Sequence, residues 1–401
     1  MEKSNYPFHV LIKPIGPVCN IACEYCFYLG KGKLFPYKKK TDFRMSEDTL
    51  ETFVKQYVNG QPCGTTEVNF TWQGGEPTLR GIDFYKKAID FQNKYRRKGM
   101  KITNAFQTNG ILLNNDWAKF FKDNNFLIGI SIDGPEKLHN RFRKDHSGVG
   151  TFSSVMAGLD ALRKYNVDFN TLTAVQSDNG NYPQEVYNFL KRIGSTFMQF
   201  IPIVEPEGKG GVSYRTVSPQ QWRNFLNTIF DLWIKQDLGR IFIQHFETIV
   251  GIYAGYPSSL CVHSPVCGRA VVLEHNGNLY SCDHFVFREN LLGNIHSTTL
   301  TNMVDSDFQK RFGLNKIKSL PLICKECPYL KLCYGGCPSN RLKKTPSGET
   351  GLNWICEGYK MFYSHTEPVF TAISECVRRR VPITEYKLLL TNSYETSRNN
   401  P

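Results

Sequence analysis

The sequence predicts an α/β protein, a partial barrel of six βα units followed by a cysteine-rich region. Between residues 8 and about 236, apolar runs of strand length alternate with amphipathic stretches of helix length. This is the pattern of a parallel sheet wrapped by helices. Six units are fewer than the eight of a closed barrel, so we expect an opened form. From Cys261 onward, cysteines become the main feature of the chain.

The expected strands recur at the spacing of βα units, and one helix follows each of them. The strands are residues 8–15, 68–73, 101–107, 127–132, 170–175 and 197–204. The helices are residues 46–58, 84–97, 117–124, 152–164, 184–192 and 219–236. Ser46 is a suitable cap for the first helix, and Glu47 and Asp48 favour the positive end of its dipole. Residues 205–217 are rich in glycine and charge, which predicts a loop.

The length and composition indicate a globular protein with room for two domains. It has 401 residues, of which 41% are apolar and 13% aromatic. The chain lacks an apolar run of the roughly 18 residues that span a membrane, and lacks a signal-peptide pattern at its N-terminus, so we expect a cytoplasmic location. The formal charge is +13, but apart from residues 38–40 and 378–380 the basic residues are scattered, which favours solvated faces over nucleic-acid binding.

Four unusual motifs fall where expected strands end. The cysteine-rich run 19–28 follows the first strand, and Gly74-Gly75-Glu76-Pro77 follows the second. Gln107-Thr108-Asn109-Gly110 and Ser131-Ile132-Asp133-Gly134-Pro135 close the third and fourth. Each motif alone is ordinary turn chemistry. Parallel barrels, however, build their sites from the loops at the carboxyl ends of their strands, so the convergence of the four predicts a binding site at one rim.

The first motif carries three cysteines within eight residues, Cys19, Cys23 and Cys26. Thiolates are soft ligands that suit iron–sulfur clusters or zinc, and either site normally takes four. A four-iron cluster on three cysteines leaves one iron open to another ligand. The alternatives are a zinc knuckle or buried structural thiols, although the sequence offers no nearby fourth ligand for zinc. The spacing Cys-x3-Cys-x2-Cys resembles the signature of radical S-adenosylmethionine (SAM) enzymes, in which the open iron chelates SAM.

The other motifs offer groups that suit a bound SAM molecule. Gly74 and Gly75 allow close approach of the backbone, and Glu76 offers a countercharge to the ammonium group, unless this is a plain turn with a solvated glutamate. Polar side chains suit the ribose and methionyl groups, with local turn capping as the alternative. These are Gln107, Asn109 and Ser131. Arg143 is suited to the SAM carboxylate, although a surface arginine fits the sequence nearly as well.

Eight cysteines between Cys261 and Cys356 are enough for two four-cysteine sites. The dense run Cys324-x2-Cys327-x5-Cys333-x3-Cys337 resembles the SPASM domain of radical SAM enzymes that modify peptides and proteins. That resemblance implies one auxiliary four-iron cluster on Cys261, Cys267, Cys282 and Cys337, and another on Cys324, Cys327, Cys333 and Cys356. Two structural zinc sites remain the alternative, because four cysteines serve both metals. Cys63 and Cys376 are left over as small apolar or surface residues.

The segment from Val271 to His284 predicts a hairpin with an Asn276-Gly277 turn, after which Cys282 and Asp283 follow directly. Residues 6–365 together resemble the anaerobic sulfatase-maturating enzymes, most closely the Bacteroides-type members. In that family an aspartate directly after this cluster cysteine is the expected general base, and Asp283 matches it. Without the resemblance, a cap or solvated carboxylate would be the simpler interpretation.

The resemblance implies oxidation of a serine or cysteine in an unfolded sulfatase segment to Cα-formylglycine. A 5′-deoxyadenosyl radical would remove a Cβ hydrogen, Asp283 would take the hydroxyl or thiol proton, and the last electron would leave through the auxiliary clusters. Three four-iron clusters, SAM and a low-potential donor such as a flavodoxin or ferredoxin are implied. Tyr28 would lie where the substrate approaches. The residues implied to line SAM are Tyr25, Gly75, Ser131, Arg143 and Val204.

The implied domains are a radical SAM partial barrel over residues 1–237, a SPASM domain over 238–365, and a C-terminal helix and tail over 366–401. Another SPASM-type maturase that crosslinks or epimerises a peptide remains an alternative, as does a non-catalytic metal-cluster protein. We expect neither nucleic-acid nor membrane partners. The sequence leaves open the choice of serine or cysteine, the partner sulfatase, the reductant, the oligomeric state and the role of the tail.

Overall fold

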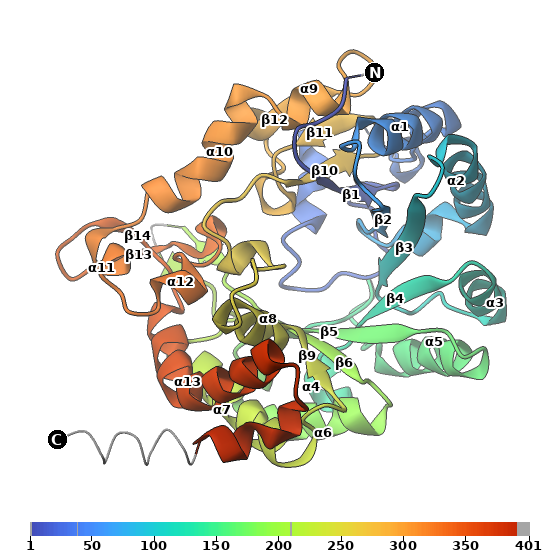
Figure 1. The fold of residues 1–401 in the computed structure, drawn as a ribbon. Coiled ribbons are helices and arrows are strands. Elements are labelled where there is room, and N and C mark those ends of the chain that lie inside the picture. The colour runs from blue at the N-terminus through green and yellow to red at the C-terminus, as the bar shows by residue number, and fades with distance from the viewer. Residues whose placement is uncertain (1, 38, 209–210, 391–401) are drawn as a thin grey trace, which may run out of the picture. The chain divides into compact units, whose positions relative to one another are not determined.

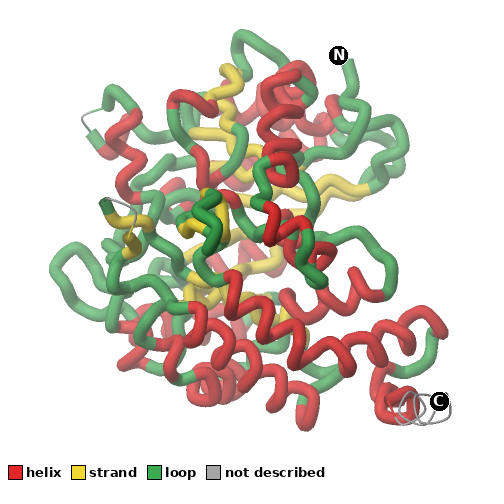
Figure 2. Tube along the Cα trace, turned by 90° about the vertical axis from the view of Figure 1, so that its left-hand side faces the viewer, coloured by secondary structure: helices red, strands yellow, loops and turns green. Residues whose placement is uncertain are grey.

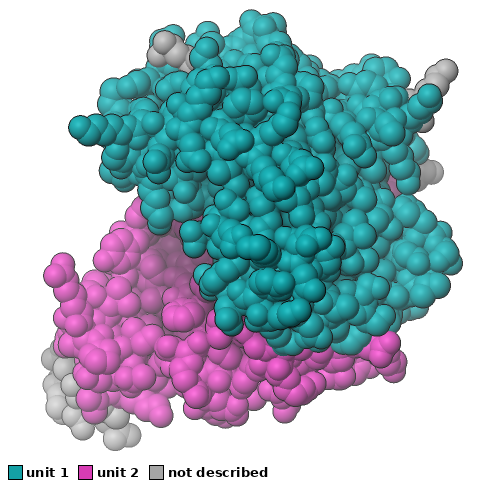
Figure 3. All heavy atoms as spheres, turned by 90° about the vertical axis from the view of Figure 1, so that its right-hand side faces the viewer, with its two compact units in different colours: residues 1–132, 139–170, 267–315 teal, residues 133–138, 171–266, 316–401 magenta. Residues whose placement is uncertain are grey.

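The structure is a computed structural model that describes residues 2–37, 39–208 and 211–390. The chain divides into two compact units, which Figure 3 colours separately. The first unit comprises the described parts of residues 1–132, 139–170 and 267–315. The second comprises those of residues 133–138, 171–266 and 316–401. Each unit is therefore assembled from segments that are far apart in the sequence.

The first unit contains a mostly parallel sheet whose central strands follow one another in chain order. The strands are β1 (His9–Lys13), β2 (Glu67–Trp72), β3 (Lys101–Thr108) and β4 (Phe126–Ser131). The intervening and following helices are α1 (Glu47–Gly60), α2 (Ile82–Tyr95), α3 (Asn115–Asp123) and α5 (Phe152–Lys164). Figure 1 shows this alternation of strands and helices. The Ser46 hydroxyl accepts a hydrogen bond from the Thr49 amide and so caps α1 as expected.

A segment from the second half of the chain continues this sheet. β10 (Ala270–Glu274) pairs in parallel with β1, in a register that sets Lys13 opposite Glu274. β11 (Asn278–Tyr280) and β12 (Leu291–Asn294) then add in antiparallel order. The turn between β10 and β11 contains Gly277 with φ +84°, a left-handed conformation that favours glycine. The expected hairpin is confirmed, and its second strand leads directly to Cys282.

The second unit contains a parallel sheet of β5 (Phe169–Val175, from Thr171 onward), β6 (Phe197–Pro202) and β9 (Phe242–Ile243). Its main helices are α6 (Pro183–Arg192), α7 (Pro219–Gln236), α8 (Gln244–Tyr253) and α13 (Cys356–Arg379). Ser218 and Gln221 form a capping box at the start of α7. The first and last residues of α7 match the sequence prediction.

The expected loop over residues 205–217 is partly wrong, because it contains a short antiparallel hairpin. The hairpin consists of β7 (Pro206–Glu207) and β8 (Gly211–Val212). Residues 209–210 between these strands lie outside the described residues. The Glu205 carboxylate accepts hydrogen bonds from Ser213 and Arg215, which holds the base of the hairpin together. The charged side chains of Glu205 and Arg215, which suggest a solvated loop, therefore pair with each other within the segment.

Shorter elements make up the rest of the regular structure, drawn among the helices and strands of Figure 2. The short α-helices are α4 (Glu136–Asn140), α9 (Leu300–Val304), α11 (Leu322–Lys325) and α12 (Leu330–Cys333). The remaining helix, α10 (Asp307–Lys318), has twelve residues. A two-stranded ribbon pairs β13 (Lys343–Lys344) with β14 (Thr350–Leu352). The 3₁₀ segments are η1 (Leu29–Leu34), η2 (Lys40–Asp42), η3 (Pro77–Arg80), η4 (Asn179–Asn181), η5 (Cys261–His263), η6 (Asp283–Phe285), η7 (Arg288–Asn290), η8 (Pro338–Asn340) and η9 (Ile383–Glu385). The end of the expected C-terminal tail, residues 391–401, lies outside the described residues.

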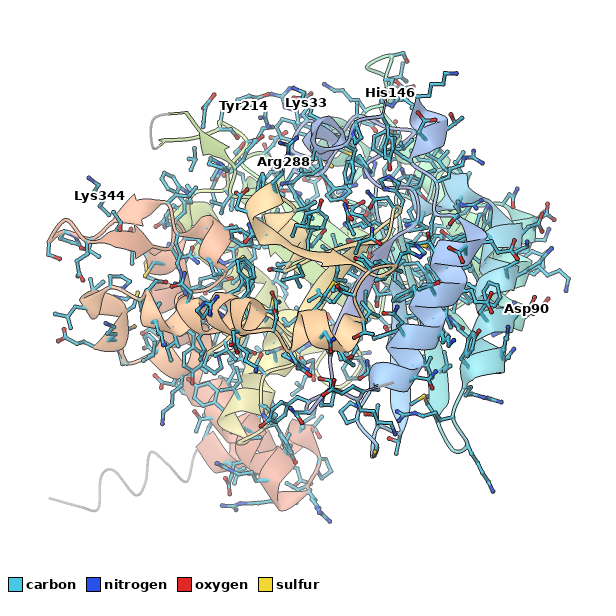
Figure 4. All side chains as sticks on the ribbon, turned by 90° about the horizontal axis from the view of Figure 1, so that it is seen from above. Lys33, Asp90, His146, Tyr214, Arg288 and Lys344 are labelled. Carbon is cyan, nitrogen blue, oxygen red and sulfur yellow. The ribbon has the colours of Figure 1, made fainter. Side chains whose placement is uncertain are left out.

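The charged surface is dispersed over many elements. Figure 4 labels Lys33, Arg288 and Lys344, three exposed basic residues that come from three different segments. Many other charged side chains pair locally, as Lys119 does with Asp123 on α3. Among the described helices, none combines the length and the apolar character needed to cross a membrane.

A close approach of two helices in the second unit gives a test of packing. A Cβ atom added to Gly358 of α13 would lie 2.4 Å from the Pro219 carbonyl oxygen of α7. We expect Gly358→Ala to lower stability by about 1–3 kcal/mol, the usual cost of overpacking. Gly251→Ala on α8 is the matched control, since its new methyl group would meet nothing within 4 Å. That control should raise stability by about 0.5–1 kcal/mol, because alanine is the better helix former. Unfolding midpoints at equal iron content measure both changes, and equal shifts would contradict the packing argument.

Candidate active site and cluster sites

The loop that carries Cys19, Cys23 and Cys26 follows β1 and packs on the glycine turn that follows β2. The Gly75 amide donates to the Gly16 carbonyl at 2.7 Å, and the Glu76 amide donates to the Val18 carbonyl at 2.9 Å. A Cβ atom on Gly75 would lie only 1.9 Å from the Val18 oxygen. The glycine is therefore needed for backbone contact with the residue directly before Cys19. This contact fixes the start of the cysteine loop.

Glu76 is buried inside the same turn and is bound by its own chain. Its carboxylate accepts hydrogen bonds from the amide and hydroxyl of Thr78, from the Thr108 hydroxyl, and from the Asn109 amide at 2.7–3.1 Å. The side chain is 0% exposed, so the alternative of a solvated glutamate is wrong. Burial raises the pKa of this carboxyl, while the hydrogen bonds oppose the rise. Glu76 thus joins the loop after β2 to the loop after β3.

Polar groups from neighbouring loops reach the three thiols. Asn109 places its amide nitrogen 2.8 Å from the Asn20 side-chain oxygen and 3.7 Å from the Cys19 sulfur. Arg143 places a guanidinium nitrogen 4.0 Å from the Cys23 sulfur. Burial raises the pKa of the Cys19 thiol to about 12, and the charge of Glu76 adds to the rise. Binding of iron at this site therefore has to displace a firmly held proton.

Arg143 is an interior residue and not the surface arginine that the sequence also allowed. Arg143 is 7% exposed, and its guanidinium group lies 5.6 Å from the centre of the Tyr25 ring. Tyr25 is buried against Phe142, with ring centres 6.3 Å apart. A buried cation beside the cysteine loop fits a site for an anionic or carboxylate ligand.

The remaining residues expected around SAM differ in how far their polar groups are already used. Gln107 donates to the Ser131 hydroxyl at 3.0 Å, which links the ends of β3 and β4. The side-chain oxygen of Asn109 accepts from the Ile111 amide at 3.1 Å, as the turn-capping alternative predicts, whereas its nitrogen faces the cysteine loop. Gly74 has φ +145°, which favours glycine. Val204 follows β6 in the second unit and is half-buried.

A buried lysine forms the centre of a second group of side chains in the first unit. Lys13 ends β1, and its ammonium group lies 2.6 Å from Asp283 Oδ1 and 3.1 Å from the Gln73 side-chain oxygen. The same ammonium lies 3.9 Å from the centre of the Tyr28 ring. Lys13 is 1% exposed on its side chain, whereas Asp283 is 20% exposed. The carboxylate therefore stays accessible while its counter-ion is enclosed.

Tyr28 and Glu274 also belong to this group, and they contact each other. The Tyr28 hydroxyl donates to Glu274 Oε1, and His275 Nδ1 lies 3.3 Å from Glu274 Oε2. Tyr28 also packs in an apolar cluster with Val272, Tyr280 and Val286. Burial raises the pKa of the Glu274 carboxyl. Tyr28 is 3% exposed, so most of its surface is already covered by its own chain.

The second unit brings one expected set of four cysteines around a single pocket. Cys324, Cys327, Cys333 and Cys356 line a space of about 430 Å³ that includes open solvent. Tyr359 and Tyr363 of α13 also line this pocket. Burial raises the pKa of Cys333 to about 11 and of Cys356 to about 12. Among the described residues, no group of three His, Cys, Asp or Glu is arranged as a ligand set for a single metal ion.

Buried polar side chains hold the backbone beside three of the other four cysteines. In the first unit, the Gln309 amide donates to the Gly268 and Ser281 carbonyls, which adjoin Cys267 and Cys282. In the second unit, the Lys316 ammonium donates to the carbonyls of Cys261, Val262 and Ser264. Cys337 places its sulfur 3.0 Å from the Ser339 hydroxyl.

The remaining two cysteines match the expectation of small apolar or surface residues. Cys63 is exposed, with its sulfur 3.2 Å from the Lys3 ammonium, and Cys376 is buried in α13. The residues present otherwise fit iron–sulfur clusters, because soft thiol ligands surround a pocket in the second unit and gather on one loop in the first. His146, labelled in Figure 4, is exposed and has a ring nitrogen 3.1 Å from the Cys19 carbonyl oxygen.

Sequence reasoning did not identify Lys13, Gln73 or Glu274 as parts of the site. Lys13 lies inside the expected strand over residues 8–15, directly after its apolar run, and Gln73 ends the expected strand over residues 68–73. The available signal for Lys13 was its charge within a strand that is expected to be buried. Glu274 lies within a strand of the expected hairpin. Its contact with Tyr28 depends on the pairing of β10 with β1, which no local pattern predicts.

Comparison with known proteins identifies the class. A profile of the radical SAM superfamily matches residues 14–190, and a profile of an iron–sulfur cluster-binding (SPASM) domain matches residues 261–328. The chain is a radical SAM protein with the α/β fold of that superfamily, as the sequence predicted.

Relatives over nearly the whole chain narrow this class to one family. A serine-type anaerobic sulfatase-maturating enzyme from Bacteroides thetaiotaomicron is 44% identical, over 96% of this chain and 95% of its own. A cysteine-type enzyme from Clostridium novyi is 35% identical, over 92% of this chain and 98% of its own. The solved structure of native anSMEcpe with bound AdoMet and Cp18Cys peptide is 34% identical, with a TM-score of 0.81 over 92% of this chain and 99% of that chain. The chain belongs to the family of anaerobic sulfatase-maturating enzymes.

The contact between Gly75 and Val18 gives a test of the cysteine loop. Gly75→Ala should displace Val18 and with it Cys19, because the new methyl group would lie 1.9 Å from a backbone oxygen. We expect the reconstituted variant to lose about four irons per chain, the content of one cluster. Gly30→Ala is the matched control, because its methyl group would meet nothing within 4 Å. Iron analysis after anaerobic reconstitution measures both variants. Full iron loading of Gly75→Ala would contradict the argument.

Proposed function

We propose that this protein oxidises a serine or cysteine side chain of a sulfatase polypeptide to Cα-formylglycine. The observation that supports it most is the position of Asp283 in the same compact unit as the three-cysteine loop. Burial is the main cause that raises the pKa of the Cys26 thiol, and the charges of Lys13 and Asp283 act on the same sulfur with opposite sign. A partly exposed carboxylate thus lies near the cysteines that family membership assigns to the SAM-binding cluster.

The chain's own residues divide the work of binding and proton transfer. When bound, SAM and the clusters would supply the one-electron chemistry, which is removal of a Cβ hydrogen atom and acceptance of the remaining electron. Asp283 accepts the proton of the substrate hydroxyl or thiol, so that one hydrogen atom, one proton and one electron leave in total. A serine target thereby becomes the aldehyde directly. A cysteine target becomes a thioaldehyde, which water converts to the aldehyde with release of hydrogen sulfide. Arg143 binds a carboxylate of SAM, and Tyr25, Gly75, Ser131 and Val204 line its pocket. Tyr28 lies where the target residue of the peptide approaches.

The polar residues between these groups hold the loops in place. Gly74 and Gly75 present their backbone to SAM, and Gln107 and Asn109 offer amide groups to it. Glu76 orders the loop that carries Asn109, since its carboxylate accepts the Asn109 amide at 2.8 Å. The four hydrogen bonds that its carboxylate accepts support a role in holding this frame, together with the countercharge that the sequence suggested.

We propose three four-iron clusters in total. One is held by Cys19, Cys23 and Cys26, and the pocket of Cys324, Cys327, Cys333 and Cys356 supports a second. A third is proposed, on the basis of family resemblance, for Cys261, Cys267, Cys282 and Cys337. A low-potential donor such as a flavodoxin or ferredoxin would reduce the protein. The domains we propose are residues 1–237, 238–365 and 366–401, and the location is the cytoplasm.

The peptide substrate is proposed to carry serine as its target. The Bacteroides enzyme, which shares 44% of its residues with this chain, is serine-type. The cysteine-type relative is 35% identical, and the peptide in the similar solved structure is named Cp18Cys. The family thus includes enzymes named for serine and enzymes named for cysteine. The higher identity of this chain to the serine-type Bacteroides enzyme favours serine as the target.

The function is tested by mass spectrometry of sulfatase-motif peptides after anaerobic incubation with reconstituted protein, SAM and a reductant. Two peptides that differ only in serine or cysteine at the target position are compared. We expect the serine peptide to lose two hydrogens, in proportion to the 5′-deoxyadenosine formed, and to react faster than the cysteine peptide. Formation of 5′-deoxyadenosine with both peptides unchanged would show that the substrate is wrong. Absence of both products at full iron loading would contradict the enzymatic role.

The role of Asp283 is tested by Asp283→Asn, which keeps the shape of the side chain and removes its basicity. We expect formylglycine formation to fall by about 100-fold or more, the usual range for loss of a general base. Cleavage of SAM should continue, because Asp283 acts on the substrate and not on SAM. Asp160→Asn, at an exposed residue paired with Arg163, is the control and should react normally. Formylglycine at the wild-type level in Asp283→Asn would exclude Asp283 as the base.

A further inference from the structure

Lys13 is one of the largest fully buried side chains of the protein, alongside tryptophans, tyrosines and phenylalanines. Lysine is almost never fully buried unless its charge is paired, because removal of an ammonium group from water is costly. Lys13 is buried at the end of β1, two residues before Ile15 and six before Cys19. A buried cation at the start of the cysteine loop therefore needs an explanation.

The contacts of Lys13 come from separate parts of the first unit. Asp283 follows β11 and pairs with the ammonium at 2.6 Å. Gln73 follows β2 and accepts from it at 3.1 Å. Tyr28 belongs to the cysteine loop and covers the ammonium with its ring at 3.9 Å. A single side chain thus joins the proposed base, the proposed substrate contact and the turn before Gly74.

The position of this ammonium is fixed from several directions. The parallel pairing of β1 with β10 places Lys13 opposite Glu274 in the register. Glu274 in turn accepts the Tyr28 hydroxyl and so holds the ring that covers the ammonium. Valine and tyrosine side chains of β10 and β11 pack around Tyr28 and exclude water from this side. The charge of Lys13 therefore acts on Asp283 at short range and without solvent screening on its buried side.

We propose that Lys13 is a positioning residue for the oxidation, acting through Asp283. The ammonium holds Oδ1 of the carboxylate, so that Oδ2 is turned toward the hydroxyl or thiol proton of the target residue. It also supplies a compensating charge when the bound peptide covers the exposed fifth of Asp283. This inference rests on the proposed function. It differs from that function in assigning the orientation of the base to a residue that does not contact the substrate.

Two substitutions separate the charge of Lys13 from its packing. Lys13→Met keeps an unbranched apolar stem and removes the charge, whereas Lys13→Arg keeps the charge and changes the shape. The quantity measured is the number of formylglycine residues formed per 5′-deoxyadenosine, at known iron content. We expect Lys13→Met to lower this ratio by about 10-fold or more, within the range that general-base catalysis contributes. Lys13→Arg should lower the ratio by less, and SAM cleavage should persist in both.

A purely structural lysine predicts the opposite order, because methionine fits an apolar enclosure better than arginine does. A wild-type ratio in Lys13→Met, or equal losses in both variants, would overturn the proposal. Loss of iron or of SAM cleavage in parallel with formylglycine would also overturn it, since Lys13 would then support the fold. Peptide affinity, measured by titration, should stay within about threefold of wild type, because Lys13 acts on orientation and not on binding.

A control variant and the wild-type protein separate a failure of the Lys13 inference from a failure of the proposed function. Lys86→Met removes an exposed lysine that pairs with Asp83 on α2, and it should leave the ratio unchanged. If the wild-type protein forms formylglycine and only the order of the Lys13 variants fails, the inference is wrong and the function stands. If the wild-type protein cleaves SAM but leaves the peptides unchanged, the proposed function itself fails.

Discussion

The parallel pairing of β1 with β10 is the constraint on which the candidate site depends. Five residue pairs join the N-terminal strand to a segment about 260 residues further on, from His9 with Ala270 to Lys13 with Glu274. This pairing places the hairpin of β10 and β11 beside the strand that leads into the cysteine loop. It thereby brings Asp283 to Lys13, whose ammonium group the Tyr28 ring also covers. A substitution that weakened this ladder would separate the proposed base from the proposed SAM-binding cysteines, although neither set would change locally.

The local elements of the fold are largely predictable from the sequence, because they depend on patterns that act over a few residues. Strand and helix periodicity locates β1 to β6, α1 to α3 and α5 to α7, and an Asn-Gly turn locates the hairpin before Cys282. The resemblance to the SPASM domain implies which cysteines belong together, and the structure gathers one of the implied sets, Cys324, Cys327, Cys333 and Cys356, around one pocket. The hairpin over residues 206–212 was missed, because its glycine and charge content resembles that of a loop.

The contacts that organise the site are not predictable in the same way, because they depend on register between distant segments. Lys13 ends an apolar strand, and nothing near it in the sequence shows that Asp283 and Tyr28 will cover it. The burial of Glu76 has the same origin, since its partners Thr108 and Asn109 belong to the next βα unit. For Glu76 the sequence also allowed a solvated position, and for Lys13 it suggested no contact with another loop. The structure shows instead that these charges hold loops together.

Three carboxylates lie in or beside the site, and their surroundings separate one of them from the others. Glu76 accepts four hydrogen bonds from amides and hydroxyls, which uses most of the acceptor capacity of a carboxylate. Glu274 is buried and holds Tyr28 and His275. Asp283 alone is partly exposed, and it is held by a cation through one oxygen. A carboxylate that must take a proton from a substrate needs both access and an oxygen that is not already used. Of the three, only Asp283 meets these two conditions, and Lys13 is the residue that lets it do so at a partly buried position.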